Sequence, residues 1–193
     1  AIGWYGDRGD EELTEDSAVG EGFLPEVCSD WEGASADLPD EVRHVYLRSG
    51  IVLSGTGGAL GKMLMPFKMG AGGPMGNGKQ WMSWISLDDE IYAIHHLLME
   101  TGSKGVYNLT APNPVRQKGF AKTLGRVLRR PAFAPLPGFV IKILFGEMGV
   151  KLTLESQKVL PNRLLEEGYE FLHPDLETAL QDTLGPVSYT HLR

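Results

Sequence analysis

Tyr5 is the first residue in the chain whose side chain could transfer a proton. It ends the apolar run 1–5 and is followed by Gly6 and an acidic loop, a pattern that predicts the carboxyl end of a buried strand. Open α/β sheets bind their ligands at such strand ends. A phenol there could act as a general acid, or its ring could pack beneath a ligand pocket, and the sequence leaves both roles open.

The stretch "KQWMSWISLDD" contains the densest set of candidate binding groups. Gln80 and Ser83 supply polar atoms, while Trp81 and Trp84 supply flat apolar faces. Alternation along a strand puts Trp81 and Ser83 on one face, and Gln80, Met82 and Trp84 on the other. Because tryptophan is costly to expose, one of the two indoles is expected in the core. These four residues are the candidate substrate contacts.

Arg48, Gly50 and Ile51 lie near the end of another predicted strand, residues 42–53. Gly50 has no Cβ, so a ligand could approach the backbone closely at this point. A plain strand-end turn is the alternative interpretation. The glycine-rich loop 70–78 is either a lid with glycine hinges or a simple flexible connection.

Composition and charge exclude several classes of protein. The 193-residue chain is 42% hydrophobic and 22% charged, as in ordinary globular domains, and its net charge of -7 disfavours nucleic-acid binding. No apolar run approaches the roughly 18 residues of a membrane span. The single cysteine, Cys28, fits a reducing compartment, and we expect a cytoplasmic protein. His95 and His96 would diverge by roughly 100° on a helix, and no zinc spacing exists, so no metal site is expected.

Strands alternate with helices along most of the chain, which predicts an α/β sheet with crossover connections. The expected strands are 1–5, 42–53, 80–87 and 105–110, and the expected helices are 20–36, 57–70, 88–100, 114–130, 137–148, 153–168 with a break at Pro161, and 174–184. Asp88 is expected to cap the helix 88–100, with Ile91, Ile94 and Leu98 on its buried face. So few strands suit the second half of a doubly wound domain rather than a complete one.

Six stretches in order along the chain resemble one family. They are "AIGWYGDRGDEELTED", "GFLPEVCSDWE", "LRSGIVLS", "GGPMGNGKQWMSWISLDD", "YNLTAPNPV" and "QKVLPNRLLEEGYEF". They resemble the epimerase-like family of the extended short-chain dehydrogenase/reductase superfamily, whose members end in the domain of unknown function DUF1731. The resemblance implies that residues 1–130 are the second half of a Rossmann-like parallel sheet and that 131–185 form a small, mostly helical domain. It also implies that the cofactor-binding half precedes Ala1, and residues 186–193 look like a non-native tail.

The resemblance implies an altered catalytic centre. Members of the superfamily use a Tyr-x-x-x-Lys pair, and Phe23 and Val27 stand at the matching positions here, where neither can move a proton. Glu26 between them could act as a base if burial raised its pKa, or it is a solvated helix charge. Met82 stands where nucleotide-sugar enzymes carry an arginine that grips the diphosphate, which argues against a nucleotide-sugar substrate.

The resemblance implies NADP or NAD as the cofactor of the complete protein, with Arg48, Gly50 and Ile51 passing its nicotinamide. Tight binding to this chain alone is not expected, because "GTGGALG" only mimics the phosphate-binding fingerprint and lacks the acidic residue about 20 positions on. The expected function is that of an epimerase-like oxidoreductase acting on an unknown small molecule. The alternatives are a non-catalytic cofactor-binding or interaction protein on the same fold, and an inactive fragment.

Overall fold

The structure is a computed structural model that describes residues 1–35, 37–39, 41–133, 135–136, 141–143, 146 and 153–185. The expected tail 186–193 and most of the expected helix 137–148 lie outside the described residues. The strands are β1 (Glu12–Leu13), β2 (Val45–Ser49), β3 (Ile51–Leu53), β4 (Trp81–Met82), β5 (Trp84–Ser86), β6 (Gly105–Leu109), β7 (Val115–Arg116) and β8 (Lys158–Val159). The helices are the 3₁₀ helix η1 (Ile2–Tyr5) and the α-helices α1 (Phe23–Gly33), α2 (Gly58–Lys68), α3 (Leu87–Met99), α4 (Gln117–Leu128), α6 (Asn162–Glu166) and α7 (Leu176–Leu184).

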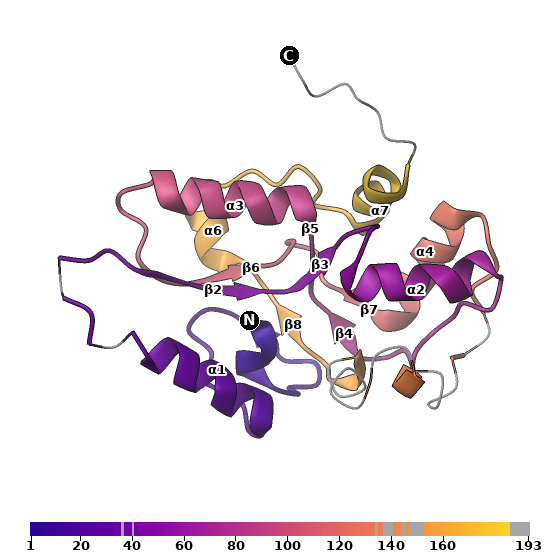
Figure 1. The fold of residues 1–193 in the computed structure, drawn as a ribbon, viewed down its shortest axis with the longest axis horizontal. Helices are drawn as coiled ribbons and strands as arrows, with labels where there is room; N and C mark the ends of the chain where they lie inside the picture. The colour runs from indigo at the N-terminus through magenta and orange to yellow at the C-terminus, as the bar shows by residue number, and fades with distance from the viewer. Residues whose placement is uncertain are drawn as a thin grey trace, which may run out of the picture.

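Parallel strands form the centre of the fold, as predicted (Figure 1). The expected strand 42–53 is divided at Gly50, with β2 pairing in parallel with β6 and β3 pairing in parallel with β5. Gly50 N donates to Leu109 O at 2.9 Å, and Ile51 N donates to Ser83 O at 2.9 Å. At Gly50 the chain therefore changes its hydrogen-bonding partner, from β6 on one side to β5 on the other.

Residues 2–5 form a 3₁₀ helix, so the prediction of a strand over 1–5 is wrong. Trp4 N bonds to Ala1 O and Gly6 N bonds to Gly3 O, which closes a tight turn in place of a sheet ladder. The apolar run reflected burial instead: Ile2 and Tyr5 are both buried. Periodicity cannot separate a short buried helix from a buried strand in a run this short.

The α3 helix begins one residue before the predicted start, at Leu87, and its N-cap lies two residues before the predicted one. Ser86, not Asp88, is the N-cap, and its hydroxyl accepts a hydrogen bond from Asp89 N at 3.0 Å. The buried residues of α3 are Asp89, Ala93 and Leu97, whereas the predicted core residues Ile91 and Leu98 are exposed. The apolar pattern was misleading because the buried face of the helix is centred on a carboxylate. Likewise α1 exposes Phe23 and Trp31, which its helical spacing had placed on a buried face.

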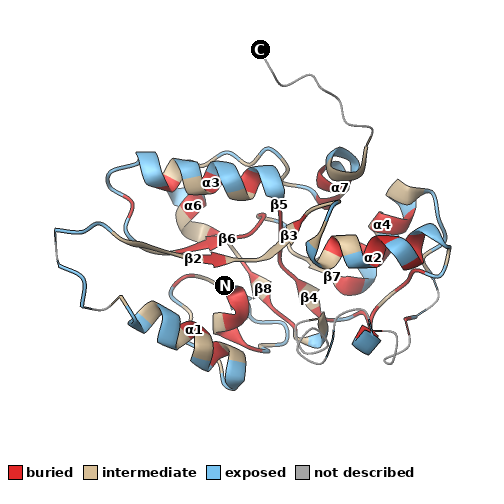
Figure 2. Cartoon of the chain, in the orientation of Figure 1, coloured by how far each residue is buried: buried red, intermediate tan, exposed pale blue. Residues whose placement is uncertain are grey.

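Buried residues follow the strands and the inner sides of the helices (Figure 2). One cluster joins α2, α4 and α7, a second joins α3 to β5 and β6, and a small third one surrounds Tyr5 and Leu13. Among the helices that the structure describes, none has the length and apolar character needed to span a bilayer.

The glycine-rich loop 70–78 is held in place at its centre. Met75 is 1% exposed, its N–H donates to Gln117 Oε1 at 2.8 Å, and its carbonyl accepts from Gln80 Nε2 at 3.0 Å. A buried, hydrogen-bonded centre is a feature of a packed loop, so neither the lid nor the flexible connection describes this part of it.

Residues after 153 are interleaved with the first part of the chain. β8 pairs in parallel with β1, and α7 packs against α4 in the largest cluster. Asp89 on α3 is 0% exposed and accepts hydrogen bonds from Leu172 N at 2.8 Å and His173 N at 3.0 Å. A buried carboxylate satisfied by backbone donors thus fixes this C-terminal segment to α3.

Candidate functional site

An apolar cavity of about 480 Å³ lies where η1, α1, the β2–β3 junction, the start of α2 and β4 meet. Gly50 and Ile51 line one part of it, and Trp81, Met82 and Ser83 line another. The structure therefore brings together two of the three predicted cofactor contacts and two of the four predicted substrate contacts. Cavities of this size and character are typical of small-molecule sites.

Gly50 is required to be glycine by its neighbours. A Cβ at this position would lie 2.7 Å from Ser83 O and 2.9 Å from Thr110 Cγ2, distances that real Cβ atoms do not adopt. Its backbone consequently lies closer to Ser83 and Thr110 than a residue with a Cβ would allow. The sequence predicted a close approach to the backbone at Gly50, and the structure has one, but it is made by these neighbouring parts of the chain.

Arg48 lies behind the cavity and does not line it. The side chain is 3% exposed, and its guanidinium forms two hydrogen bonds of 2.8 Å with the Glu32 carboxylate. The guanidinium carbon also lies 3.9 Å from the centre of the Trp4 ring. Arg48 therefore links α1 to η1 and the sheet. Its guanidinium is hydrogen-bonded to these groups and does not line the cavity.

Tyr5 is also enclosed. It is 0% exposed, its hydroxyl donates to Asn108 Oδ1 at 2.7 Å, and it accepts from Arg48 Nη1 at 3.1 Å. Burial raises the pKa of the Tyr5 phenol, although the hydrogen bonds of Arg48 and Asn108 oppose the shift. A phenol with a raised pKa holds its proton, whereas a catalytic acid–base group needs a pKa near the working pH.

Gln80 and Trp84 lie away from the cavity. Trp84 is 0% exposed and its indole N–H donates to Asn113 O at 3.2 Å, so one of the two indoles is in the core, as expected. Gln80 is 6% exposed and donates to Met75 O and Thr153 O. Gln80 and Trp84 are separated from Trp81 and Ser83, as the alternation predicted, but Met82, expected on the face of Gln80 and Trp84, lines the cavity with Trp81 and Ser83. The predicted strand is interrupted at Ser83, between β4 and β5.

Phe23 and Val27, the positions predicted to match the dyad, differ in their surroundings. Val27 lines the cavity, whereas Phe23 is 61% exposed and Glu26 is exposed and does not line it. Within the described part of the chain, no three His, Cys, Asp or Glu side chains are grouped so that they could hold a metal ion.

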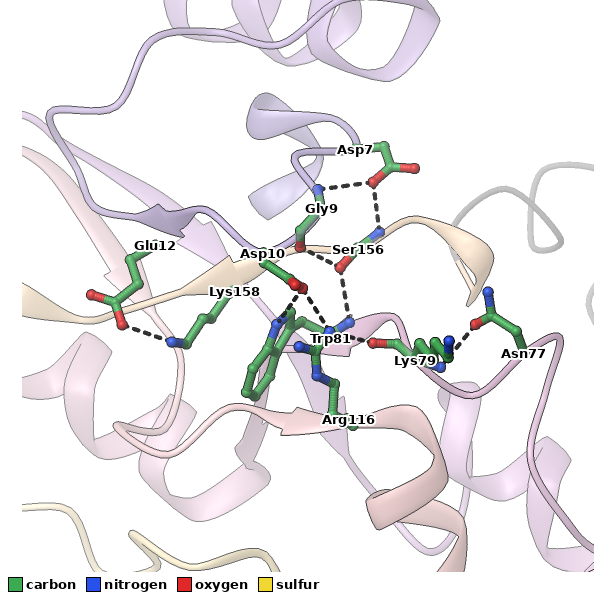
Figure 3. A network of polar contacts seen from close by, with 10 residues as sticks. All are labelled: Asp7, Gly9, Asp10, Glu12, Asn77, Lys79, Trp81, Arg116, Ser156 and Lys158. Carbon is green, nitrogen blue, oxygen red and sulfur yellow. Dashed lines mark hydrogen bonds and ion pairs between the residues drawn. The ribbon is translucent and has the colours of Figure 1, made fainter.

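Trp81 is held from its outer side by a polar network (Figure 3). Its indole N–H donates to Asp10 Oδ1 at 3.1 Å, and the guanidinium of Arg116 lies 4.1 Å from the ring centre. Arg116 in turn forms a 2.7 Å ion pair with Asp10, and the Lys158 ammonium lies 4.9 Å from the ring centre. The indole is thereby fixed as a wall of the cavity.

Thr153, Glu155 and Gln157 also line the cavity, and sequence reasoning missed all three. Residues 153–154 are helical, in line with the predicted helix 153–168, but residue 155 is a bend and residues 156–157 are irregular before β8. No local pattern in "TLESQKV" indicates that these residues line a cavity.

Comparison with known proteins agrees with the geometry. Residues 136–183 match the domain of unknown function DUF1731. The chain is 45% identical, over 94% of its length, to the Arabidopsis thaliana chloroplastic homologue of epimerase family protein SDR39U1. It also superposes on human epimerase family protein SDR39U1, solved with NADPH, with a TM-score of 0.89 and 37% identity over 96% of this chain. The chain is thus similar to members of this epimerase family over nearly all of its own length. It spans 52% of the Arabidopsis protein and 64% of the human one.

A second solved relative is the nucleoside-diphosphate sugar epimerase of Corynebacterium glutamicum. It is 35% identical, with a TM-score of 0.76 over 96% of this chain and 36% of that protein. The Rossmann-like α/β fold and the resemblance to epimerase-family proteins are therefore confirmed.

Proposed function

We propose that the complete protein is an NAD(P)-binding, epimerase-like oxidoreductase whose cavity holds a small substrate beside the nicotinamide. One observation carries this proposal: the cavity combines the Gly50–Ile51 backbone with the Trp81 and Ser83 wall. The human relative solved with NADPH supports the choice of cofactor class. NADP and NAD stay equal candidates, because the phosphate-binding fingerprint is absent from this chain.

The cavity fits the nicotinamide end of such a cofactor. The Gly50 backbone lines the cavity, and Ile51, Val27 and Met82 supply apolar surface that excludes water. When bound, the nicotinamide would donate or accept a hydride. The chain's own contribution would be to orient the ring against the β2–β3 junction and to keep the site dry.

This chemistry also requires a group that donates or accepts a proton, and the dyad positions do not supply one. The two dyad positions hold Phe23 and Val27, and we propose that Tyr5 is a positioning residue, since its hydroxyl is already bonded to Arg48 and Asn108. These observations favour a second candidate function: cofactor binding without turnover on the same fold. A turnover assay separates the two candidates.

The substrate is proposed to be a small molecule other than a nucleotide sugar. Met82 is 5% exposed, lines the cavity and has neither a charge nor a donor for a diphosphate. The Corynebacterium relative is named as a nucleoside-diphosphate sugar epimerase, and Met82 argues against a nucleotide-sugar substrate for the protein described here.

The proposal is tested on the complete protein, including the region that we expect before Ala1. NADPH and NADH are titrated while the fluorescence of the four tryptophans is followed, since Trp31 and Trp81 line the cavity. Saturable quenching supports the cofactor assignment, and its absence for both cofactors refutes it. Oxidation of bound NADPH with a panel of ketones and aldehydes indicates an oxidoreductase, whereas binding without oxidation indicates the second function.

The division into domains at residues 130 and 131, the cytoplasmic location and the lack of a nucleic-acid partner also stay proposals. The Arabidopsis relative is named as chloroplastic, so the location is best tested by imaging the tagged complete protein. Limited proteolysis tests the domain boundary.

A further inference from the structure

Basic residues are concentrated in one part of this acidic chain. Residues 101–146 contain eight of the 18 Lys and Arg residues and none of the 25 Asp and Glu residues, although the whole chain has a net charge of -7. Helix α4 lies within this stretch. Cations recur along it at a spacing of four residues, which places Lys118, Lys122 and Arg126 in a row on one side of the helix.

This row lines a groove of about 640 Å³. Arg130, just after α4, is the fourth cation in the groove, and the rest of the described lining is apolar. None of the described residues that line the groove also lines the apolar cavity of the candidate site. The two sites therefore consist of different residues.

Main-chain contacts hold the walls of the groove together. Arg130 N donates to Gly125 O at 2.8 Å, and a Cβ at Gly125 would lie 2.5 Å from Ala132 Cβ. The chain after α4 therefore folds back closely against the helix. Leu136 N then donates to Pro74 O at 2.9 Å, which joins this returning segment to the glycine-rich loop. The groove is thus formed by the fold itself.

Most of the positive charge in the groove is not neutralised. Arg126 forms an ion pair with Glu177 of α7. Lys118, Lys122 and Arg130 are exposed, and none of them forms an ion pair within the described part of the chain. Like charges four residues apart on a helix repel each other, so the row by itself disfavours the helix. Carboxylates from another molecule would relieve this repulsion, as Glu177 does for Arg126.

An acidic protein segment matches the groove better than a nucleic acid does. Pro74, Ala132 and Phe133 form its apolar part, and Phe133 is 81% exposed. A phosphate backbone has no apolar group to pack there, and the net charge of -7 opposes the approach of so densely charged a polymer. An extended protein segment, in contrast, can present carboxylates on one side and apolar side chains on the other.

We propose that the groove binds an extended, acidic segment of a partner protein. The carboxylates of that segment pair with the cations of α4 and Arg130, and its apolar side chains pack against Phe133. This interaction goes beyond the proposed function and does not depend on cofactor or substrate binding in the cavity.

The test measures binding of three fluorescently labelled octapeptides to the complete protein by anisotropy at low salt. The first alternates glutamate with leucine, the second glutamine with leucine, and the third glutamate with serine. We expect the first to bind at least about tenfold more tightly than the other two, and to lose affinity as salt is added.

Several results would overturn the inference. Equal affinity of the first two peptides removes the role of charge, and equal affinity of the first and third removes the apolar contact. No binding of the first peptide refutes the docking groove. Tighter binding of a single-stranded RNA octanucleotide than of the first peptide identifies the groove as a nucleic-acid site instead.

The double variant Lys122→Gln, Arg130→Gln is expected to weaken binding of the first peptide about tenfold. Lys68→Gln with Lys104→Gln is the matched control, because it removes the same charge from exposed residues outside the groove. An equal loss in both double variants overturns the inference. The order of the three peptides on the wild-type protein decides the matter even if a variant does not fold. NADPH titration tests the proposed function separately, since the groove and the cavity share no described residue.

Discussion

Replacing Ser83 by alanine is expected to destabilise the protein by about 2–4 kcal/mol. Ser83 is 1% exposed, and its hydroxyl donates to Gln157 O and accepts from Val159 N, both at 2.8 Å. Alanine removes only the hydroxyl oxygen, so little packing is lost. The cost comes from the two backbone groups that lose their partner.

The magnitude follows from those two groups. Val159 is 0% exposed and Gln157 is 8% exposed, so water has little access to either. An unsatisfied buried donor or acceptor costs about 1–3 kcal/mol, and partial relaxation of the segment makes the sum smaller than two full penalties. If Ser83 were mainly a substrate contact, alanine would weaken substrate binding and leave stability within about 0.5 kcal/mol of wild type.

Denaturant unfolding of the complete protein measures the effect, with hydrogen exchange at the Val159 amide as a local readout. Ser54→Ala is the control, because the Ser54 hydroxyl contacts the Thr56 hydroxyl at an exposed position. A loss of stability no larger than that of the control, with protection at Val159 unchanged, would refute the assignment of Ser83 to the structure of the wall.

Three further changes test other parts of the molecule. Gly50→Ala is expected to reduce NADPH affinity tenfold or more, because the new Cβ would lie 2.7 Å from Ser83 O. Gly61→Ala is the control: its Cβ would lie 3.6 Å from the nearest atom, so the fluorescence titration should not change. Burial raises the pKa of Glu15 above its usual value, so its contribution to stability is greatest at low pH and is lost as the pH rises through the folded-state pKa. Glu15→Gln should therefore flatten the fall in stability above pH 4.5. Denaturant unfolding across pH 4 to 8 measures the free energy of unfolding, and equal slopes against pH for the wild type and the variant would contradict the prediction. Asp89→Ala should lower the free energy of unfolding by about 3–5 kcal/mol, because it leaves buried backbone donors unpaired. A decrease of only a few degrees or less in the midpoint of thermal unfolding would contradict this prediction.

Features close together in the chain were predictable. The helix 57–70 entered through glycines, the parallel strands, and the alternation of Gln80 and Trp81 all follow from local pattern and backbone geometry. The errors fell where burial has a tertiary cause. The 3₁₀ helix η1 has the same apolar composition as a strand, and Asp89 on the buried face of α3 accepts hydrogen bonds from Leu172 N and His173 N, which lie more than 80 residues away.

The sequence by itself carried the resemblance to the epimerase family and the class of fold, because these depend on residue identity along the chain. Only the tertiary structure decided which polar residues face the cavity. Arg48 and Tyr5 satisfy each other and Glu32 and Asn108 in the interior, so their chemistry is used within the fold. Gln157 lies at the cavity because its segment is hydrogen-bonded to Trp81 and Ser83, and no local pattern records a contact between segments more than 70 residues apart.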